Sequence, residues 1–298
     1  MPSGIIIKGI SGFYYVESDD GIYECKARGI FRKNELTPLP GDRVEFSVTD
    51  LAQRKGSLDR ILDRTTLLAR PAVANVNQLV AVIAAKTPEP DLLLLDKLLV
   101  TSEKNGMKAV LCINKIDLDT DDIRRSICNA YTNAGYLVLE TSSRENKGFH
   151  ELKAALNGHI SVFAGQSGVG KSTLLNMVMN TMVMKTGGLS DKIERGRHTT
   201  RHAELIEIED GGYVADTPGF SSFELAGIER AELQHCYPEF EPYKYDCRFT
   251  GCSHLSEPDC GVKRALAEGS VDEGRYGRYA ALYAFLKQEE DMKYKKKQ

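Results

Sequence analysis

The chain has 298 residues, of which 42% are hydrophobic and 27% charged, and its formal net charge is −3 at pH 7. This composition predicts a globular chain that can bury a sizeable core, and the length predicts about two to three domains. Because the whole chain is slightly acidic, any nucleic-acid contact has to use local basic groups, such as those within 28–33 or in the tail 293–297, for which a solvated charge run is the alternative.

No apolar run reaches the roughly 18 residues that a membrane-spanning helix needs, and residues 1–8 lack the organisation of a signal peptide. We therefore expect a cytoplasmic protein without a membrane partner. Seven cysteines in that compartment argue against a disulfide framework. Four of them are expected to be ordinary buried residues: Cys25, Cys112, Cys128 and Cys236.

Residues 1–70 are expected to form a small β-barrel domain. Turns of Gly, Asp, Asn and Pro separate four runs rich in β-branched and aromatic residues, at 4–17, 21–31, 41–49 and 57–64. An OB-fold is favoured because about five short strands fit this length, and the surface of such barrels commonly binds oligonucleotides. Four aromatic residues could either stack on bases or fill the barrel core: Phe13, Tyr14, Tyr15 and Tyr23.

From residue 77 the pattern changes to alternating strands and helices, which predicts an α/β nucleotide-binding domain over 71–223 with a mostly parallel sheet. The apolar run 78–85 is typical of a strand that is covered on both faces. Asp91 is expected to cap a helix over 92–104.

A motif able to recognise a base follows the predicted strand 108–113; it consists of Asn114, Lys115, Ile116 and Asp117. The Asp117 carboxylate can accept hydrogen bonds from guanine N1–H and N2–H₂, whereas adenine presents no such donors. Alone, the motif could also be a polar strand-to-helix turn. A second base-contacting loop is predicted after the strand 136–139, at Thr141, Ser142 and Ser143, for which a helix N-cap is the alternative.

The stretch GQSGVGKS matches the complete phosphate-binding pattern G-x-x-x-x-G-K-[ST], between a predicted strand at 159–164 and a helix that begins near residue 173. Its backbone N–H groups and Lys171 can hold phosphates, and the Ser172 hydroxyl can bind Mg²⁺. The predicted phosphate contacts are Gly165, Gln166, Ser167, Gly168, Val169, Gly170, Lys171, Ser172 and Thr173.

The order of these motifs is unusual, because the base motif precedes the phosphate loop, whereas an ordinary GTPase carries it downstream. This order predicts a circularly permuted GTPase domain. A strand at 213–215 then leads into Asp216-Thr-Pro-Gly219, where Asp216 can hold Mg²⁺ through water and the Gly219 N–H can sense the γ-phosphate. A simple turn is the alternative.

The polar segment 196–202 occupies the position of the first switch, with a basic solvated loop as the alternative. Either Thr199 or Thr200 is expected to complete the Mg²⁺ shell, and Thr200 is favoured. Phe220 stands where many GTPases carry a Gln that orients water, so intrinsic hydrolysis is expected to be slow. His198 could position the water instead, or could be a structural or RNA-facing residue.

A cluster near the C-terminus predicts a metal site in a third domain, over 224–298. Three cysteines and a histidine suffice for a closed tetrahedral zinc site: Cys247, Cys252, His254 and Cys260. Unligated or redox-active cysteines are the alternatives. The final helix carries an apolar stripe that favours the core over a recognition surface: Tyr276, Tyr279, Ala280, Tyr283 and Leu286.

Together these motifs resemble the RsgA family of ribosome small-subunit-dependent GTPases, also called YjeQ or YloQ. The resemblance covers nearly the whole chain and implies an OB domain, a circularly permuted GTPase domain and a C-terminal zinc domain. It also implies a cytoplasmic enzyme that binds the 30S subunit and its 16S rRNA, assists late maturation, and hydrolyses GTP when the subunit stimulates it. The family's zinc ligands correspond to the four residues named above, and His198 matches a histidine proposed to serve in catalysis.

One structural zinc ion, Mg²⁺ with GTP or GDP, and a monomeric state are therefore expected. The main alternative is a nucleotide-gated RNA-binding module whose turnover is negligible. A P-loop ATPase or small-molecule kinase is disfavoured by Asp117 and by the lack of an evident acceptor pocket. Because both switch segments directly precede the zinc domain, closure around the γ-phosphate could reorient that domain relative to the barrel.

Overall fold

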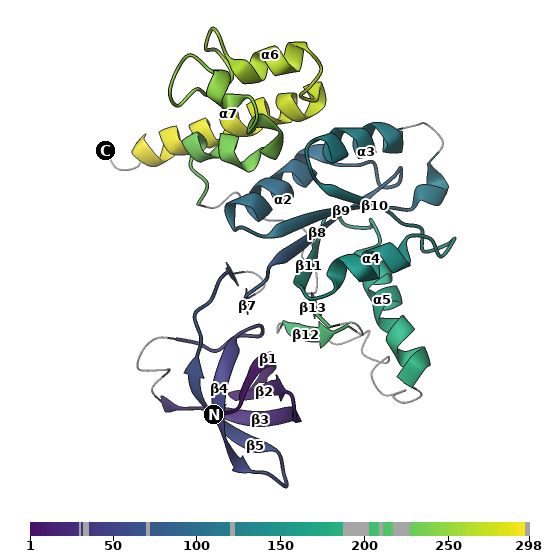
Figure 1. The fold of residues 1–298 in the computed structure, drawn as a ribbon, viewed down its shortest axis with the longest axis vertical. Helices are drawn as coiled ribbons and strands as arrows, with labels where there is room; N and C mark the ends of the chain where they lie inside the picture. Colours follow the sequence, from purple (N-terminus) through teal and green to yellow (C-terminus); the bar gives the residue numbers. More distant parts are fainter. Residues whose placement is uncertain are drawn as a thin grey trace. The chain divides into compact units, whose positions relative to one another are not determined.

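The computed structural model describes residues 1–29, 31, 36–69, 72–119, 123–186, 203–208, 211–216 and 227–295 (Figure 1). The chain divides into two compact units. Unit 1 is drawn from 1–79, 149–163 and 172–220, and unit 2 is drawn from 80–148, 164–171 and 221–298. The domain boundaries expected from the sequence, at 70/71 and 223/224, stay predictions.

The first five strands of unit 1 form a closed barrel: β1 (Ser3–Ile10), β2 (Phe13–Ser18), β3 (Gly21–Ala27), β4 (Arg43–Asp50) and β5 (Lys55–Ile61). Their order is β1-β2-β3-β5-β4, and a pairing of β1 with β4 closes the ring. All neighbours are antiparallel except β3 and β5, which run parallel. The predicted five-stranded barrel is therefore confirmed.

One strand boundary differs from the prediction. The run 4–17 is a hairpin of β1 and β2 rather than one element, because Ser11 and Gly12 form a turn with φ angles of 50° and 86°. Glycine adopts this left-handed backbone readily because it has no Cβ, so Gly12 favours a turn at this point. The apolar alternation continues on both sides of the turn, so the periodicity alone did not mark the break.

The aromatic residues of the barrel differ in whether they belong to its core. Tyr23 is 4% exposed and packs on the fully buried Phe46, with 5.1 Å between ring centroids. Phe13, in contrast, is half buried and lies under the ammonium of Lys26 at 5.2 Å. Tyr23 is thus a core residue, whereas three other rings stay partly open to solvent: Phe13, Tyr14 and Tyr15.

The rest of unit 1 contains short strands and two helices: β6 (Leu67–Ala69), β7 (Ala72–Ala74), α4 (Phe149–Leu156), all but the last residue of β11 (Ile160–Ala164), all but the first residue of α5 (Lys171–Thr186), β12 (Glu204–Glu207) and β13 (Tyr213–Asp216). Strand β13 pairs in parallel with β11 and antiparallel with β12.

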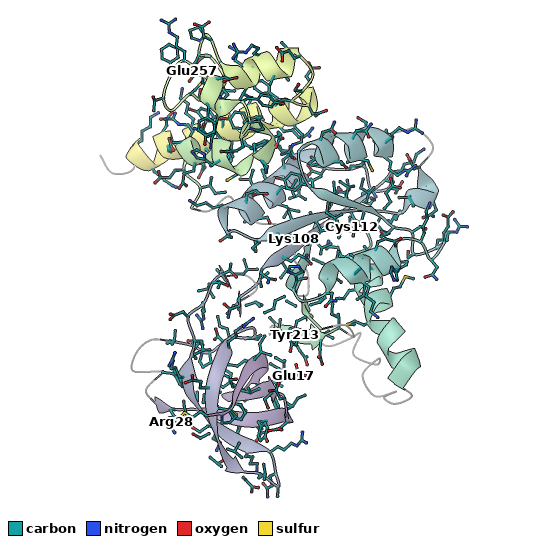
Figure 2. All side chains as sticks on the ribbon, viewed as in Figure 1. Glu17, Arg28, Lys108, Cys112, Tyr213 and Glu257 are labelled. Atoms are coloured by element: carbon teal, nitrogen blue, oxygen red, sulfur yellow. The ribbon has the colours of Figure 1, made fainter. Side chains whose placement is uncertain are left out.

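Strand β1 of the barrel also pairs with β12, at Lys8 and Glu204. The two side chains form an ion pair with 3.1 Å between Lys8 Nζ and Glu204 Oε2. The Tyr213 hydroxyl of β13 donates to Glu17 of β2 at 2.9 Å, and both residues are labelled in Figure 2. Backbone pairing and side chains therefore both join the barrel to β12 and β13.

Unit 2 begins with a parallel α/β arrangement: most of β8 (Gln78–Ala84), then α2 (Leu92–Lys104), β9 (Lys108–Asn114), η1 (Ile116–Leu118), α3 (Ile123–Asn133) and β10 (Leu137–Glu140). The strand order is β10-β9-β8, and β9 and β10 run parallel. Every residue of β8 is buried, as predicted for a strand covered on both faces. Asp91 caps α2 by accepting the Leu94 N–H at 2.8 Å, which confirms the predicted helix and its cap.

The C-terminal part of unit 2 consists of short helices followed by one long helix: η2 (Arg230–Cys236), η3 (Pro238–Phe240), η4 (Lys244–Asp246), α6 (Gly261–Ala267) and α7 (Glu273–Lys295). Its core contains Tyr237, Phe240, Tyr279 and Leu286, with Tyr276 and Tyr283 packed against it. The stripe on the last helix is therefore a core face, as predicted. Among the described residues, no helix is both long and apolar enough to cross a membrane.

Three of the four cysteines that were expected to be buried are so: Cys25, Cys112 and Cys236. The prediction is wrong for Cys128, which is partly exposed on α3 and donates its thiol hydrogen to Glu140 at 3.1 Å. Helix α3 is amphipathic and buries only Ile127 and Tyr131, so the neighbouring positions reach solvent.

Candidate nucleotide and metal sites

The predicted phosphate loop leaves β11 at Gly165 and ends at Lys171, the first residue of α5. Gly165 has a φ of 143°, and an added Cβ there would overlap the carbonyl oxygen of Val82. Gly170 has a φ of 98°, and its Cβ would overlap the side-chain amide of Asn114. Both positions therefore require glycine, which is the backbone freedom that a phosphate cradle needs.

Lys171 is held over this loop by two backbone carbonyls. Its Nζ donates to the oxygens of Gly165 at 2.7 Å and Gln166 at 2.8 Å. Burial lowers the pKa of Lys171, because a desolvated ammonium is less stable than a hydrated one. A phosphate would offer this ammonium a negatively charged partner in place of the carbonyls. Ser172 and Thr173 are exposed on the first turn of α5.

The predicted base motif is bonded directly to the phosphate loop. Asn114 is 1% exposed, and its Nδ2 donates to the Val169 carbonyl at 2.8 Å. Lys115 has a left-handed backbone with a φ of 61°, and its Nζ donates to the carbonyls of Gly168 at 2.7 Å and Thr87 at 2.8 Å. Thus two motifs that are far apart in the sequence form one site, and Thr87 joins it without any signal in the sequence.

The second predicted base loop meets the same motif. The Ser142 hydroxyl donates to Asp117 Oδ1 at 2.6 Å, and the Thr141 hydroxyl donates to Asn114 Oδ1 at 3.0 Å. Reciprocal backbone hydrogen bonds of 3.1 and 3.0 Å between Ser142 and Lys147 close the loop. Helix α4 begins later, at Phe149, so the alternative of a helix N-cap at 141–143 is wrong.

The other predicted nucleotide contacts are only partly described. Ile116 and Ser143 are half buried, whereas Ser167 and Gly168 are exposed. Asp216 is the last residue of β13. Five residues lie outside the described part of the chain: His198, Thr199, Thr200, Gly219 and Phe220. Their predicted roles stay predictions.

The four predicted metal ligands converge. One ligand atom from each of Cys247, Cys252, His254 and Cys260 lies within 4.8 Å of all the others. The Cys247 and Cys260 sulfurs are 3.8 Å apart, and His254 Nδ1 lies 3.5 and 3.4 Å from them. Tetrahedral Zn²⁺ with bonds of about 2.3 Å to sulfur and about 2.05 Å to nitrogen requires separations of about 3.8 and 3.6 Å. The donor set therefore fits a tetrahedral ion.

The cluster is supported by residues that the sequence pattern did not single out. Gln234 Oε1 lies 3.0 Å from His254 Nε2, an outer contact that fixes which imidazole nitrogen faces the ligands. Burial lowers the pKa of His254, which favours the neutral form that binds metals. Burial alone would raise the pKa of Glu257 (Figure 2), but hydrogen bonds from Ser253 and Leu255 lower it to about 2. Glu257 therefore braces the loop between ligands as a carboxylate.

Comparison with known proteins identifies two family models that match the chain. The RsgA GTPase model matches residues 61–226, and the RsgA N-terminal domain model matches residues 3–55. The small ribosomal subunit biogenesis GTPase RsgA of Ruminiclostridium cellulolyticum is 57% identical over 289 residues, which cover 96% of this chain and 94% of that protein. The protein of the same name from Clostridium perfringens is 48% identical over 276 residues, covering 93% and 95%.

Two solved structures share the fold along nearly the whole chain. YjeQ from Thermotoga maritima is 39% identical, with a TM-score of 0.83, and the match covers 96% of this chain and 98% of that one. YloQ, described as a circularly permuted GTPase, is 40% identical with a TM-score of 0.83, and the match covers 97% and 96%. The predicted fold class, including the circular permutation, is thereby confirmed.

Proposed function

Because the chain belongs to the RsgA family, we propose that it is a GTPase of small ribosomal subunit biogenesis that hydrolyses GTP to GDP and phosphate. The observation that carries this proposal is the direct bonding of the base motif to the phosphate loop, through Asn114 and Val169 and through Lys115 and Gly168. These bonds fix the distance between a base and its phosphates. A nucleoside polyphosphate is therefore the ligand that the site fits.

Guanine is the base that the recognition loop favours. The Ser142 hydroxyl donates to one lone pair of Asp117 Oδ1. The remaining lone pairs of the carboxylate are available to guanine N1–H and N2–H₂. Adenine has no donors in this pattern, so it would leave the carboxylate unpaired. Ile116 and Ser143 are half buried and are proposed to contact the base.

Asp117→Asn should lower the affinity for GTP by about 10²-fold, because two hydrogen bonds to a charged acceptor are lost or reversed. The same change should raise the affinity for XTP, whose base presents an acceptor to the new amide. Competition binding of GTP, XTP and ATP measures this shift. Asp119→Asn is the matched control, since Asp119 is bound by Arg124 at 2.8 Å and is not assigned to the base. Unchanged GTP preference in Asp117→Asn would refute the assignment.

The phosphates are assigned to the backbone N–H groups of 165–170 and to Lys171. Mg²⁺, when bound, neutralises the phosphate charge that develops during transfer. We assign its protein contacts to Ser172, which is exposed at the start of α5, and to Thr200 and Asp216. Gly219 is proposed to sense the γ-phosphate through its N–H, and Thr199 is the alternative to Thr200.

Hydrolysis is proposed to depend on the small subunit. Phe220 cannot orient a water molecule, which leaves His198 as the proposed residue for that task. Binding of the 30S subunit and its 16S rRNA would position His198 for this task and so raise turnover. The protein would act in late subunit maturation as a cytoplasmic monomer, and GTP would favour docking. Equal 30S affinity with GDP and with a non-hydrolysable GTP analogue would argue against that last step.

The decisive experiment is GTP turnover by the metal-loaded protein alone and with 30S, 50S or 70S particles, with ATP as a control substrate. We expect strong stimulation by 30S particles alone and no turnover of ATP. Tight GTP binding without stimulation by any particle would instead favour a nucleotide-gated RNA-binding module with negligible turnover.

The metal is proposed to be one structural Zn²⁺. Three thiolates and one imidazole leave no open position on a four-coordinate ion, so the ion would stabilise the fold and take no part in hydrolysis. Cys252, His254 and Cys260 are at most 5% exposed, which keeps water from the centre of the cluster.

Chelation should unfold the segment around the cluster, since zinc contributes on the order of 10 kcal/mol to small zinc modules. Elemental analysis should find one zinc ion per chain, and limited proteolysis after chelation should cut within 247–260. Cys260→Ser should reproduce this sensitivity without a chelator, whereas Cys128→Ser, outside the cluster, should not. An apoprotein with unchanged resistance to proteolysis would contradict the structural role.

A further inference from the structure

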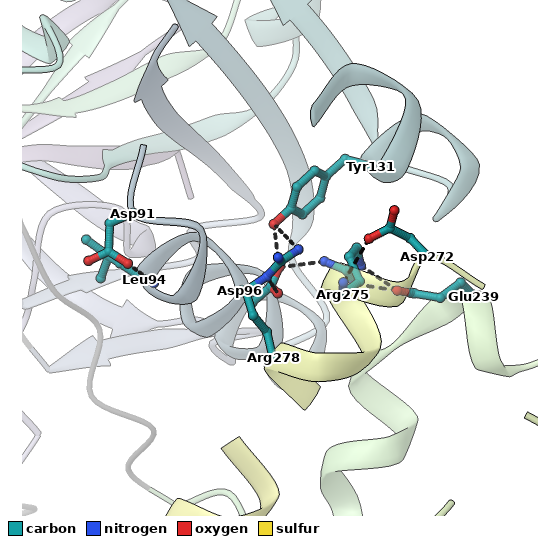
Figure 3. A network of polar contacts seen from close by, with 8 residues as sticks. All are labelled: Asp91, Leu94, Asp96, Tyr131, Glu239, Asp272, Arg275 and Arg278. Carbon is teal, nitrogen blue, oxygen red and sulfur yellow. Dashed lines mark hydrogen bonds and ion pairs between the residues drawn. The ribbon is translucent and has the colours of Figure 1, made fainter. Parts of the chain in front are cut away.

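A buried network of charges lies in unit 2, between α2, α3 and the C-terminal helices (Figure 3). At its centre is Asp96 of α2, whose side chain is 0% exposed. Asp96 accepts hydrogen bonds from the Tyr131 hydroxyl at 2.7 Å, from Arg275 Nη1 at 2.7 Å and from Arg278 Nε at 2.5 Å. A single carboxylate thus holds two guanidinium groups of α7 and one hydroxyl of α3.

Arg275 completes the network on the side of the C-terminal helices. Its Nε donates to Glu239 Oε1, and its Nη2 donates to Glu239 Oε2 at 3.1 Å. Its guanidinium also lies over the rings of Tyr131, Tyr136 and Tyr237, at 4.8, 5.4 and 4.9 Å from their centroids. With Arg278, two cations balance two carboxylates; the side chains of Asp96, Glu239 and Arg275 are at most 5% exposed, and the Arg278 side chain is 18% exposed. Such a network tolerates little displacement, because every buried charge depends on its partners.

The same turn of α7 also holds the metal loop. The Tyr276 hydroxyl donates to the carbonyl of His254 at 2.6 Å, and the Tyr279 hydroxyl donates to the carbonyl of Ser253 at 2.7 Å. The segment 275–279 therefore binds α2 through its two guanidinium groups and binds the metal loop through its two phenol hydroxyls. A shift of this turn would move the backbone of the ligand His254 and the carboxylate contacts together.

We propose that Asp96 is a positioning residue for the metal site, so that metal binding at the cluster and attachment of α7 to α2 are thermodynamically coupled. The inference rests on metal occupancy of the cluster and not on GTP hydrolysis. Asp96 touches no ligand; it fixes the turn whose hydroxyls fix the ligand loop. Coupling of this kind is reciprocal, so loosening either end loosens the other.

The contact between α2 and the C-terminal helices also provides a control. Lys104 of α2 forms an ion pair with Glu232 of η2 at 2.6 Å, but this pair is exposed to solvent. An exposed pair contributes little to stability and constrains its partners weakly. Lys104→Gln therefore removes a charge contact between the same two parts of unit 2 without disturbing the buried network.

The first test measures the rate of zinc release to a chromophoric chelator from the full-length protein. Asp96→Asn should release zinc about tenfold faster than the wild type, in the range seen for the loss of outer-shell partners, and so should Tyr276→Phe. Both changes act through the same turn of α7, so their effects should overlap. The double variant should therefore release zinc faster than the wild type by a smaller factor than the product of the two single-variant factors. Lys104→Gln should release it at the wild-type rate. Wild-type release by Asp96→Asn, or strictly multiplicative effects in the double variant, would overturn the proposal.

The second test needs no substitution, so it stands even if a variant folds poorly. Hydrogen exchange of the wild-type protein is compared before and after chelation. The proposal expects faster exchange in α2 as well as in the metal loop, with no change in α4 of unit 1. Faster exchange that is confined to 247–260 would refute the coupling. Neither test uses GTP or ribosomal particles. Their outcome is therefore independent of the turnover experiment that tests the proposed function.

Discussion

Lys171→Met should lower GTP turnover, measured with 30S particles, by about 10²- to 10³-fold, the loss that follows removal of one preorganised donor to developing charge. Lys171 is the last residue of the phosphate loop, and its ammonium donates to the carbonyl oxygens of Gly165 and Gln166. Methionine keeps the apolar stem and removes only the ammonium. The change should therefore affect phosphate binding and hydrolysis rather than the fold.

Lys108→Met is the matched control, because Lys108 is an exposed lysine at the start of β9 and takes no part in the assigned site. It should keep the wild-type turnover and the wild-type thermal midpoint. If Lys171→Met kept turnover within about threefold of the wild type at an unchanged thermal midpoint, the assignment of the phosphate loop would be wrong.

Arg275→Met should lower the free energy of unfolding by about 3–5 kcal/mol, the usual consequence of removing one partner from a buried ion pair. The substitution leaves Asp96 and Glu239 without their shared cation, in surroundings where Arg275 is 1% exposed. Urea denaturation of the zinc-loaded protein, followed by circular dichroism, measures the loss. Tryptophan fluorescence is not an option, because the chain has no Trp.

The exposed pair of Arg248 and Asp259 provides the comparison, with side chains that are 68% and 66% exposed. Arg248→Met should change the free energy of unfolding by less than about 1 kcal/mol, because solvent screens such a pair. A loss of similar size in both variants would show that burial does not distinguish the two arginines.

Local signals predicted much of this fold. The helix Leu92–Lys104 and its cap at Asp91 were predictable because capping acts within a few residues. The phosphate loop and the base motif were predictable because each chemistry requires particular residues at fixed spacing. Their hydrogen bonding to each other followed only once the fold had brought them together.

Long-range polar partners could not be predicted in the same way. The sequence pattern did not single out Asp96, and its partner Arg275 is 179 residues away in the chain. Gln234 likewise carries no sign that it would meet a metal ligand. A charged residue is expected to be exposed when only the sequence is known, because burying a charge is normally unfavourable. Its burial depends on partners that the periodicity of the sequence does not reveal.

The pairing of β1 with β12 affects how the protein is made. Lys8 leaves the ribosome early, but its partner Glu204 is 196 residues later in the chain. At about 5–20 residues per second, translation separates their synthesis by about 10–40 s. The barrel is complete only after β5, which ends at Ile61, so it waits for most but not all of that interval with the edge of β1 that later meets β12 unpaired. During this time pairing with another nascent chain competes with correct assembly.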